Sequence, residues 1–88
     1  MMYLALIHQD EPEGEFGVSF PDFPGCVTAG NTLAEAKALA GEALFGHLQA
    51  MRLAGLADAI PEPSTLGAVM QHEDYSDSLA VLPVEVTA

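Results

Sequence analysis

The chain has 88 residues, which is enough for one small domain, and its formal net charge is −11 because two basic residues oppose thirteen acidic ones. Binding to phosphate groups requires clustered Lys and Arg, so this composition argues against direct contact with nucleic acid or with an anionic membrane surface. The same charge favours a basic protein partner, since opposite electrostatic fields speed encounter and select partners. The alternative is that the acidity serves only to keep a hydrophobic domain in solution.

Half of the residues are hydrophobic, which predicts a folded chain. The chain has one cysteine, Cys26, so an internal disulfide cannot form and a reducing cytoplasm is the expected location. The apolar start, residues 1–8, is short and lacks the basic flank of a signal peptide, and no apolar run approaches the roughly 20 residues that span a membrane. We therefore expect one cytoplasmic domain over residues 1–88.

The first third of the sequence predicts three strands joined by short links. Residues 2–8 are apolar on both faces, which is typical of a central strand. Residues 15–20 alternate, with Phe16, Val18 and Phe20 on one face. A Pro- and Gly-containing turn over residues 21–25 leads into a short third strand over 26–30.

A long helix is predicted to follow. Thr32 and Glu35 have the spacing of a capping box, so the helix should begin at about residue 33, and Gly55 is a plausible end. Apolar residues close to 3.6-residue spacing predict a stripe that faces the core: Leu33, Ala36, Ala40, Leu44, Leu48 and Met51.

The remaining residues predict a loop, a helical turn and a last strand. The loop ends in Pro61-Glu62-Pro63-Ser64, and Ser64 is a candidate cap for a short helical turn through Met70. Residues 78–86 form the last strand, in which Pro83 requires an edge or a bulge because proline has no N–H to donate.

The element order β-β-β-α-β predicts an α+β fold with one main helix packed on one face of the sheet. The first three strands form an antiparallel meander. A right-handed crossover then places the last strand beside the first and parallel to it. The expected product is a four-stranded mixed sheet in the order 3-2-1-4, with the first strand at its centre.

Residues 17–36, GVSFPDFPGCVTAGNTLAEA, resemble the core motif of HicB-like antitoxins. The shared features are a strand that ends in an aromatic residue, a P-D-x-P-G-C turn, a short strand, a capped helix and a later Pro-Glu-Pro-Ser-like loop at residues 61–64. The likeness extends over residues 2–86.

The resemblance implies a reduced RNase H-like fold and binding to a small basic HicA-type toxin that cleaves mRNA. It implies inhibition by masking the active surface of the toxin. Many relatives also carry a C-terminal DNA-binding domain. Because this sequence stops after the last strand, we expect no such domain within residues 1–88.

Two groups of residues are candidates for partner binding. One is an acidic loop and the other is the turn after the second strand: Asp10, Glu11, Glu13, Phe20, Asp22 and Phe23. An exposed Phe23 would serve as an anchor, since loops often carry function. Each group also has a structural alternative, as a solvated hairpin tip or, for Asp22, as a cap of its own turn. Gly25 and Cys26 are predicted to be structural.

No metal, cofactor or catalytic centre is expected. His8, His47 and His72 are spread along the chain, and neighbours such as Glu73 and Asp74 do not converge on one ion. Two-metal hydrolysis needs converging carboxylates, whereas the strand acids Glu15 and Glu85 lie near strand ends. The sequence thus predicts a binding protein and not an enzyme.

Two rival functions remain open. The stronger rival is a structural or regulatory protein that forms a symmetric dimer or higher oligomer through the apolar edge of its last strand. The residues expected at that interface are Leu79, Val81, Leu82 and Val84. The weaker rival is a degraded nuclease with residual activity.

Overall fold

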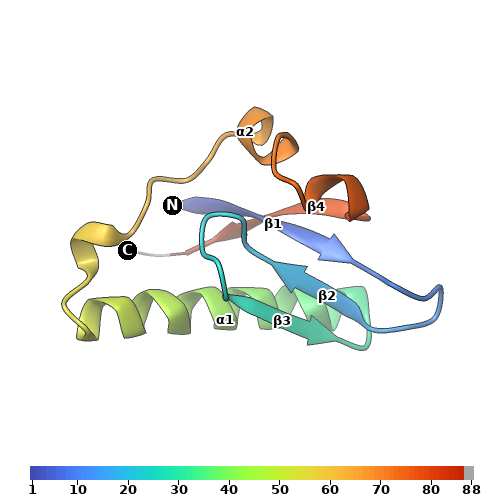
Figure 1. Ribbon diagram of the computed structural model, residues 1–88. Coiled ribbons are helices and arrows are strands. Elements are labelled where there is room, and N and C mark those ends of the chain that lie inside the picture. Colours follow the sequence, from blue (N-terminus) through green and yellow to red (C-terminus); the bar gives the residue numbers. More distant parts are fainter. Residues whose placement is uncertain (87–88) are drawn as a thin grey trace.

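The computed structural model describes residues 1–86. These residues form a single sheet with one long helix against one face and a shorter helical segment on the other side (Figure 1). In chain order the elements are β1 (Met2–His8), β2 (Phe16–Ser19), β3 (Val27–Gly30), α1 (Leu33–Leu53), η1 (Ala57–Ala59), α2 (Leu66–Met70), η2 (Tyr75–Asp77) and β4 (Ala80–Glu85). None of the described helices is both long enough and apolar enough to cross a membrane.

The sheet has the order β3-β2-β1-β4, which confirms the predicted order and the central place of β1. All neighbouring strands are antiparallel, so the prediction of a mixed sheet is wrong. β4 starts beside the end of β1, where Ile7 pairs with Ala80. The reason is the path of residues 54–79. These residues leave the end of α1 and cross the opposite side of the sheet before β4 begins (Figure 1). This second passage along the sheet brings the chain to the end of β1, so β4 runs back antiparallel to β1.

The main core lies between the sheet and α1. The core stripe of α1 is confirmed at its centre, where four residues are buried: Ala36, Ala40, Leu44 and Leu48. They pack against residues of the strands and of the β2–β3 turn: Tyr3, Ala5, Ile7, Val18, Phe20, Phe23, Cys26 and Val84. The ends of the stripe are looser, because Met51 is half-buried and Leu33 is exposed. Small Ala36 and Ala40 let the helix backbone approach the sheet closely.

Both ends of α1 are fixed by hydrogen bonds that the sequence predicts. The Thr32 hydroxyl accepts from the Glu35 N–H at 3.0 Å, and the Glu35 carboxylate accepts from the Asn31 N–H at 3.1 Å. The second bond reaches one residue before the cap. At the other end Gly55 has φ +77°, and the N–H of Leu56 donates to the carbonyl of Met51. This is the Schellman arrangement that ends many helices at a glycine.

Three glycines near α1 differ sharply in their surroundings. A Cβ added at Gly30 would lie 2.6 Å from the Ala36 nitrogen, so the end of β3 touches the backbone of the first helical turn. Gly41 and Gly46, in the middle of α1, have open space where a Cβ would be.

We therefore expect opposite effects from the same substitution at two sites. Gly46→Ala should raise the free energy of unfolding by about 0.5–1 kcal/mol, because alanine lowers the entropy lost in a helix. Gly30→Ala should lower it by about 1–3 kcal/mol, because the added methyl group overlaps the backbone of α1. Urea unfolding of both variants measures the difference, and equal effects would contradict this account of the β3–α1 contact.

Candidate functional site

The two faces of the sheet have different covers. Alternation along β1 turns Tyr3, Ala5 and Ile7 toward α1 and turns Leu4, Leu6 and His8 to the opposite side, here called the outer face. Figure 1 shows α2 on this side. Leu6 is fully buried although it lies outside the α1 core, and Val69 of α2 is buried as well. The outer face is therefore covered near the centre of β1.

The part of the outer face formed by β2 and β3 is open. The strand register turns Gly17 and Ser19 of β2, and Val27 and Ala29 of β3, to this side. These side chains are small, and Val27 is 65% exposed. Two hollows of about 340 and 430 Å³ lie here and share Ser19 and Val27. We call the surface over Gly17, Ser19 and Val27 the trough.

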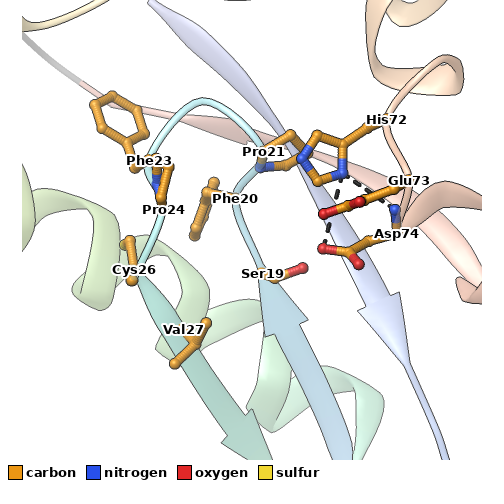
Figure 2. Close-up of a pocket in the computed structure, with 11 residues that line it drawn as sticks. Ser19, Phe20, Pro21, Phe23, Pro24, Cys26, Val27, His72, Glu73 and Asp74 are labelled. Atoms are coloured by element: carbon orange, nitrogen blue, oxygen red, sulfur yellow. Dashed lines mark hydrogen bonds and ion pairs between the residues drawn. The ribbon is translucent and has the colours of Figure 1, made fainter.

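Residues 72–77 form one wall of the trough. Figure 2 shows His72, Glu73 and Asp74 facing the β2–β3 turn across the first hollow. His72 Nδ1 accepts a hydrogen bond from the Asp74 N–H at 3.2 Å and lies 3.7 Å from the Asp74 carboxylate. His8 Nε2 is 3.0 Å from Ser19 Oγ on the floor. The wall therefore holds its shape through local contacts, while the carboxylates stay open to solvent.

Four carboxylates line the two hollows: Asp10, Glu73, Asp74 and Asp77. The two basic side chains of the sequence, Lys37 and Arg52, both lie on α1, which covers the other face of the sheet. A concave surface lined by one sign of charge concentrates its field. The trough can thus attract a positively charged surface, and no Lys or Arg of the chain itself neutralises it.

The predicted acidic loop contributes only in part to this site. Asp10 lines the second hollow, whereas Glu11 and Glu13 are exposed at the hairpin tip, where the Gly14 N–H donates to the Glu11 carbonyl at 2.9 Å. Sequence reasoning considered residues 72–74 only as a metal site, and missed Asp77. The available signal was the polar, acidic composition of residues 71–77.

The aromatic residues of the β2–β3 turn are buried. Phe20 and Phe23 are each 2% exposed, so the expectation that Phe23 is exposed is wrong. The Phe23 ring packs edge-on against Tyr3, with ring centroids 4.8 Å apart, and against His47, at 5.5 Å. Gly25 has φ +89° and Cys26 is buried, which confirms their structural assignment. Phe20 and Phe23 therefore pack the turn against the core, and in the isolated chain neither ring is accessible to a partner.

Asp22 joins this turn to the Pro-Glu-Pro-Ser loop. Its carboxylate accepts from the Ser64 N–H at 2.9 Å and from the Ser64 hydroxyl. The Tyr3 hydroxyl donates to the Pro61 carbonyl at 2.6 Å, which fixes the same loop at a second point. The predicted cap of α2 is corrected by one residue, because the Thr65 hydroxyl accepts from the Ala68 N–H while Ser64 is engaged by Asp22.

The predicted oligomer surface on β4 is divided between the two faces. Val84 is buried and Leu82 packs against the α1 core, so these two side chains are not available at a free edge. Val81 is half-buried, and Leu79 is 61% exposed just before the strand. Self-association through this strand stays a prediction that now involves Leu79 and Val81 only.

No group of three or more His, Cys, Asp or Glu side chains within residues 1–86 is arranged to hold a metal ion. The Cys26 thiol lies 3.7 Å from the Ala43 carbonyl, and burial raises its pKa. A thiol with a raised pKa is a poor nucleophile at neutral pH. The carboxylates and the Ser19 hydroxyl that line the trough can attract cations and accept hydrogen bonds.

A double-mutant cycle tests the junction between the β2–β3 turn and the Pro-Glu-Pro-Ser loop. Asp22→Ala should lower the free energy of unfolding by about 2–3 kcal/mol, because Ser64 loses both bonds, and Ser64→Ala should lower it by about 1–2 kcal/mol. The double variant should lose less than the sum, by about 1 kcal/mol, since the two residues share one hydroxyl–carboxylate bond. Strictly additive losses in urea unfolding would contradict a direct interaction.

The buried phenol of Tyr3 predicts a loss of stability at high pH. Burial raises the pKa of Tyr3 above its ordinary value of 10.0, and the nearby carboxylates of Asp22 and Glu62 raise it further, against a lowering by Arg52. The unfolded chain therefore ionises first. The stabilisation is complete below pH 10 and is lost as pH rises through the folded value. Cys26 is replaced by alanine for this test, because its raised pKa also makes the unfolding free energy fall at alkaline pH. In this Cys26→Ala background, Tyr3→Phe should flatten the decline in unfolding free energy above pH 10. An unchanged slope would contradict this account.

Comparison with known proteins places this geometry in a family. Residues 3–88 match the family described as HicB_like antitoxin of bacterial toxin-antitoxin system. An uncharacterized 14.9 kDa protein of Haemophilus phage HP1 is 36% identical over 73 residues, which cover 80% of this chain and 52% of the relative. The chain thus spans about half the length of that relative.

Two solved structures share the fold over the full length of both chains. The N-terminal domain of Burkholderia pseudomallei antitoxin HicB is 25% identical, with a TM-score of 0.80. A chain of the HicA3 and HicB3 toxin-antitoxin complex is 29% identical, with a TM-score of 0.77. The α+β fold with its four-stranded 3-2-1-4 sheet is that of the HicB N-terminal domain. This chain therefore belongs to the HicB-like antitoxin family of bacterial toxin-antitoxin systems.

Proposed function

We propose that this chain neutralises a small basic HicA-type toxin that cleaves mRNA, by holding the toxin against the trough and masking its active surface. Membership in the antitoxin family supports the class of function. A similar structure belongs to a complex that contains both HicA3 and HicB3, which supports the class of partner. The proposed setting is the cytoplasm, where a buried Cys26 stays reduced.

The single observation that carries the proposal is that the trough gathers carboxylates with no Lys or Arg among the residues that line it, whereas the two basic residues of α1 are balanced by Glu35 and Glu42 on the same helix. Asp10, Glu73, Asp74 and Asp77 line the open hollows, while Lys37 and Arg52 lie on the helix that covers the other face. A ribonuclease surface that binds phosphates must itself be basic. An acidic, concave surface can compete for that basic surface and exclude RNA from it.

Masking requires binding and no turnover by the antitoxin. The trough offers carboxylates and small uncharged side chains such as Ser19, which can accept hydrogen bonds from Lys and Arg. Ion pairs that become partly buried against an apolar floor, here Val27, are screened less by salt than exposed pairs. The complex should therefore weaken as ionic strength rises but should survive physiological salt.

Co-expression with a HicA-type toxin tests the function, and the first toxin to try is the product of a small basic reading frame sought next to the gene. Absence of any such reading frame would count against the proposal. The chain should rescue growth of cells that express the basic protein, and the two should purify together. Rescue without a physical complex, or a complex without rescue, would contradict inhibition by masking.

Charge reversal tests the surface. Asp10→Lys and Asp77→Lys should each slow association with the basic protein by about tenfold at low salt, because the field that steers encounter is reduced. Glu42→Lys changes the net charge by the same amount on an exposed position of α1 and serves as the matched control. Association rates from surface plasmon resonance at two salt concentrations measure the effect. Equal losses in all three variants would show that only net charge matters and that the trough is not the site.

A further inference from the structure

The two edge strands of the sheet, β3 and β4, differ in how open they are to another strand. In an antiparallel pair, the backbone N–H and C=O of successive residues point alternately to the two sides of the strand. Each edge strand thus has outward residues whose N–H and C=O have no partner in the sheet. Which residues these are follows from the hydrogen bonds of β1.

The hydrogen bonds between Met1 and Val86, which flank β1 and β4, fix this alternation. The Met1 ammonium donates to the Val86 carbonyl at 2.9 Å, and the Val86 N–H donates to the Met1 carbonyl at 2.8 Å. The Ile7 carbonyl accepts from the Leu79 N–H at 2.6 Å. Odd-numbered residues of β1 therefore direct their backbone groups at β4 and the segment that enters it.

Even-numbered residues of β1 then direct their groups at β2, where Leu6 is opposite Ser19. The next residue, Val18, directs its groups at β3, where it is opposite Thr28. Thr28 is thus bonded inward, and the outward N–H and C=O of β3 belong to its neighbours Val27 and Ala29. Both residues are exposed, and their side chains point to the outer face, where Val27 forms part of the trough.

The same alternation makes Val81, Pro83 and Glu85 the outward residues of β4. Pro83 has no N–H to offer and Glu85 carries a charge, and both features discourage pairing at an edge. β3 has neither device, and residues 23–34 around it carry no charged side chain. The open edge of the sheet is therefore the one that borders the trough.

We propose that the partner adds an extended, basic segment to the β3 edge as a fifth strand, with its Lys or Arg side chains lying back over the trough toward Asp74 and Asp77. The inference rests on the function proposed above and specifies its contact. Adjacent strands lie about 4.8 Å apart, so long basic side chains on one face of the added strand can reach across Val27. Main-chain bonds to Val27 and Ala29 would supply affinity, and the carboxylates would select a basic segment.

A second copy of this chain fits the site less well. Its net charge is −11, and its two basic residues lie on α1 and not on either edge strand. Pairing two copies at β3 would bring two acidic walls toward each other, which costs free energy by like-charge repulsion. The occupant that complements this surface is a basic protein segment.

Amide hydrogen exchange tests the mode of binding directly, with the HicA-type toxin identified in the co-expression test as the probe. In the free chain the amides of Val27 and Ala29 should exchange rapidly and those of Thr28 and Gly30 slowly, because only the latter are bonded within the sheet. In the complex, exchange at Val27 and Ala29 should slow by at least about tenfold. If the complex forms without this change, the added strand is ruled out while the proposed function stands. If no complex forms, the proposed function fails, and this contact fails with it.

Two variants with a matched control complete the test. Ala29→Pro removes an outward N–H without removing a bond to β2. Val27→Lys places a cation at the trough, at a position whose side chain is already exposed. The second variant keeps the test valid if the proline disturbs folding. Each should weaken the complex by about tenfold or more, whereas Leu53→Lys, at a position 86% exposed on α1, should not. Equal affinity for Val27→Lys and Leu53→Lys would overturn the proposal. Concentration-dependent protection of Val27 and Ala29 in the free chain would also overturn it, in favour of a second copy.

Discussion

The constraint on which this structure depends is that one helix can cover only one face of a four-stranded sheet. The stripe of α1 packs closely through Ala36 and Ala40, and Gly30 lets β3 touch the first helical turn. Everything on the outer face must then be covered by the segment between α1 and β4 or stay in contact with solvent. That segment is anchored at two points, by Asp22 on Ser64 and by Tyr3 on Pro61. The anchors hold it on one part of the outer face and leave the trough open over β2 and β3.

The sequence predicts the local structure well because the local signals agree with one another. The capping pair Thr32 and Glu35, the end at Gly55 and the alternation of residues 15–20 each specify a conformation within a few residues. The direction of β4 was not predictable in the same way. It depends on the route of residues 54–79. Val69 is the one buried residue of α2, a five-residue helix too short to show a periodicity in the sequence.

The candidate site shows a similar division. The net charge indicates an acidic surface and a basic partner, and the sequence identifies Asp10 as one of its residues. Asp74 and Asp77 lie more than fifty residues further along the chain. They come close to Asp10 only because residues 54–79 cross back over the sheet. The burial of Phe23 was also beyond the sequence, because a turn with two prolines normally lies at the surface. Here the phenyl ring folds inward between Tyr3 and His47, and the exposed part of the turn is left to Pro24 and Gly25.

The floor of the trough shows that its openness is not required by the backbone. Gly17 has no positive φ, and a Cβ placed there would meet the His8 carbonyl at 3.8 Å, an ordinary contact, so alanine or a larger residue fits the strand. Glycine inside a strand costs roughly 0.5–1 kcal/mol relative to alanine. The fold accepts this cost at a position whose side chain would fill the hollow beside Ser19. Gly17 lies on β2, next to the edge strand β3, and lines the same hollow as Asp74 and Asp77 of the acidic wall. The lost stability and the available space therefore occur where a basic strand added at β3 would place its side chains.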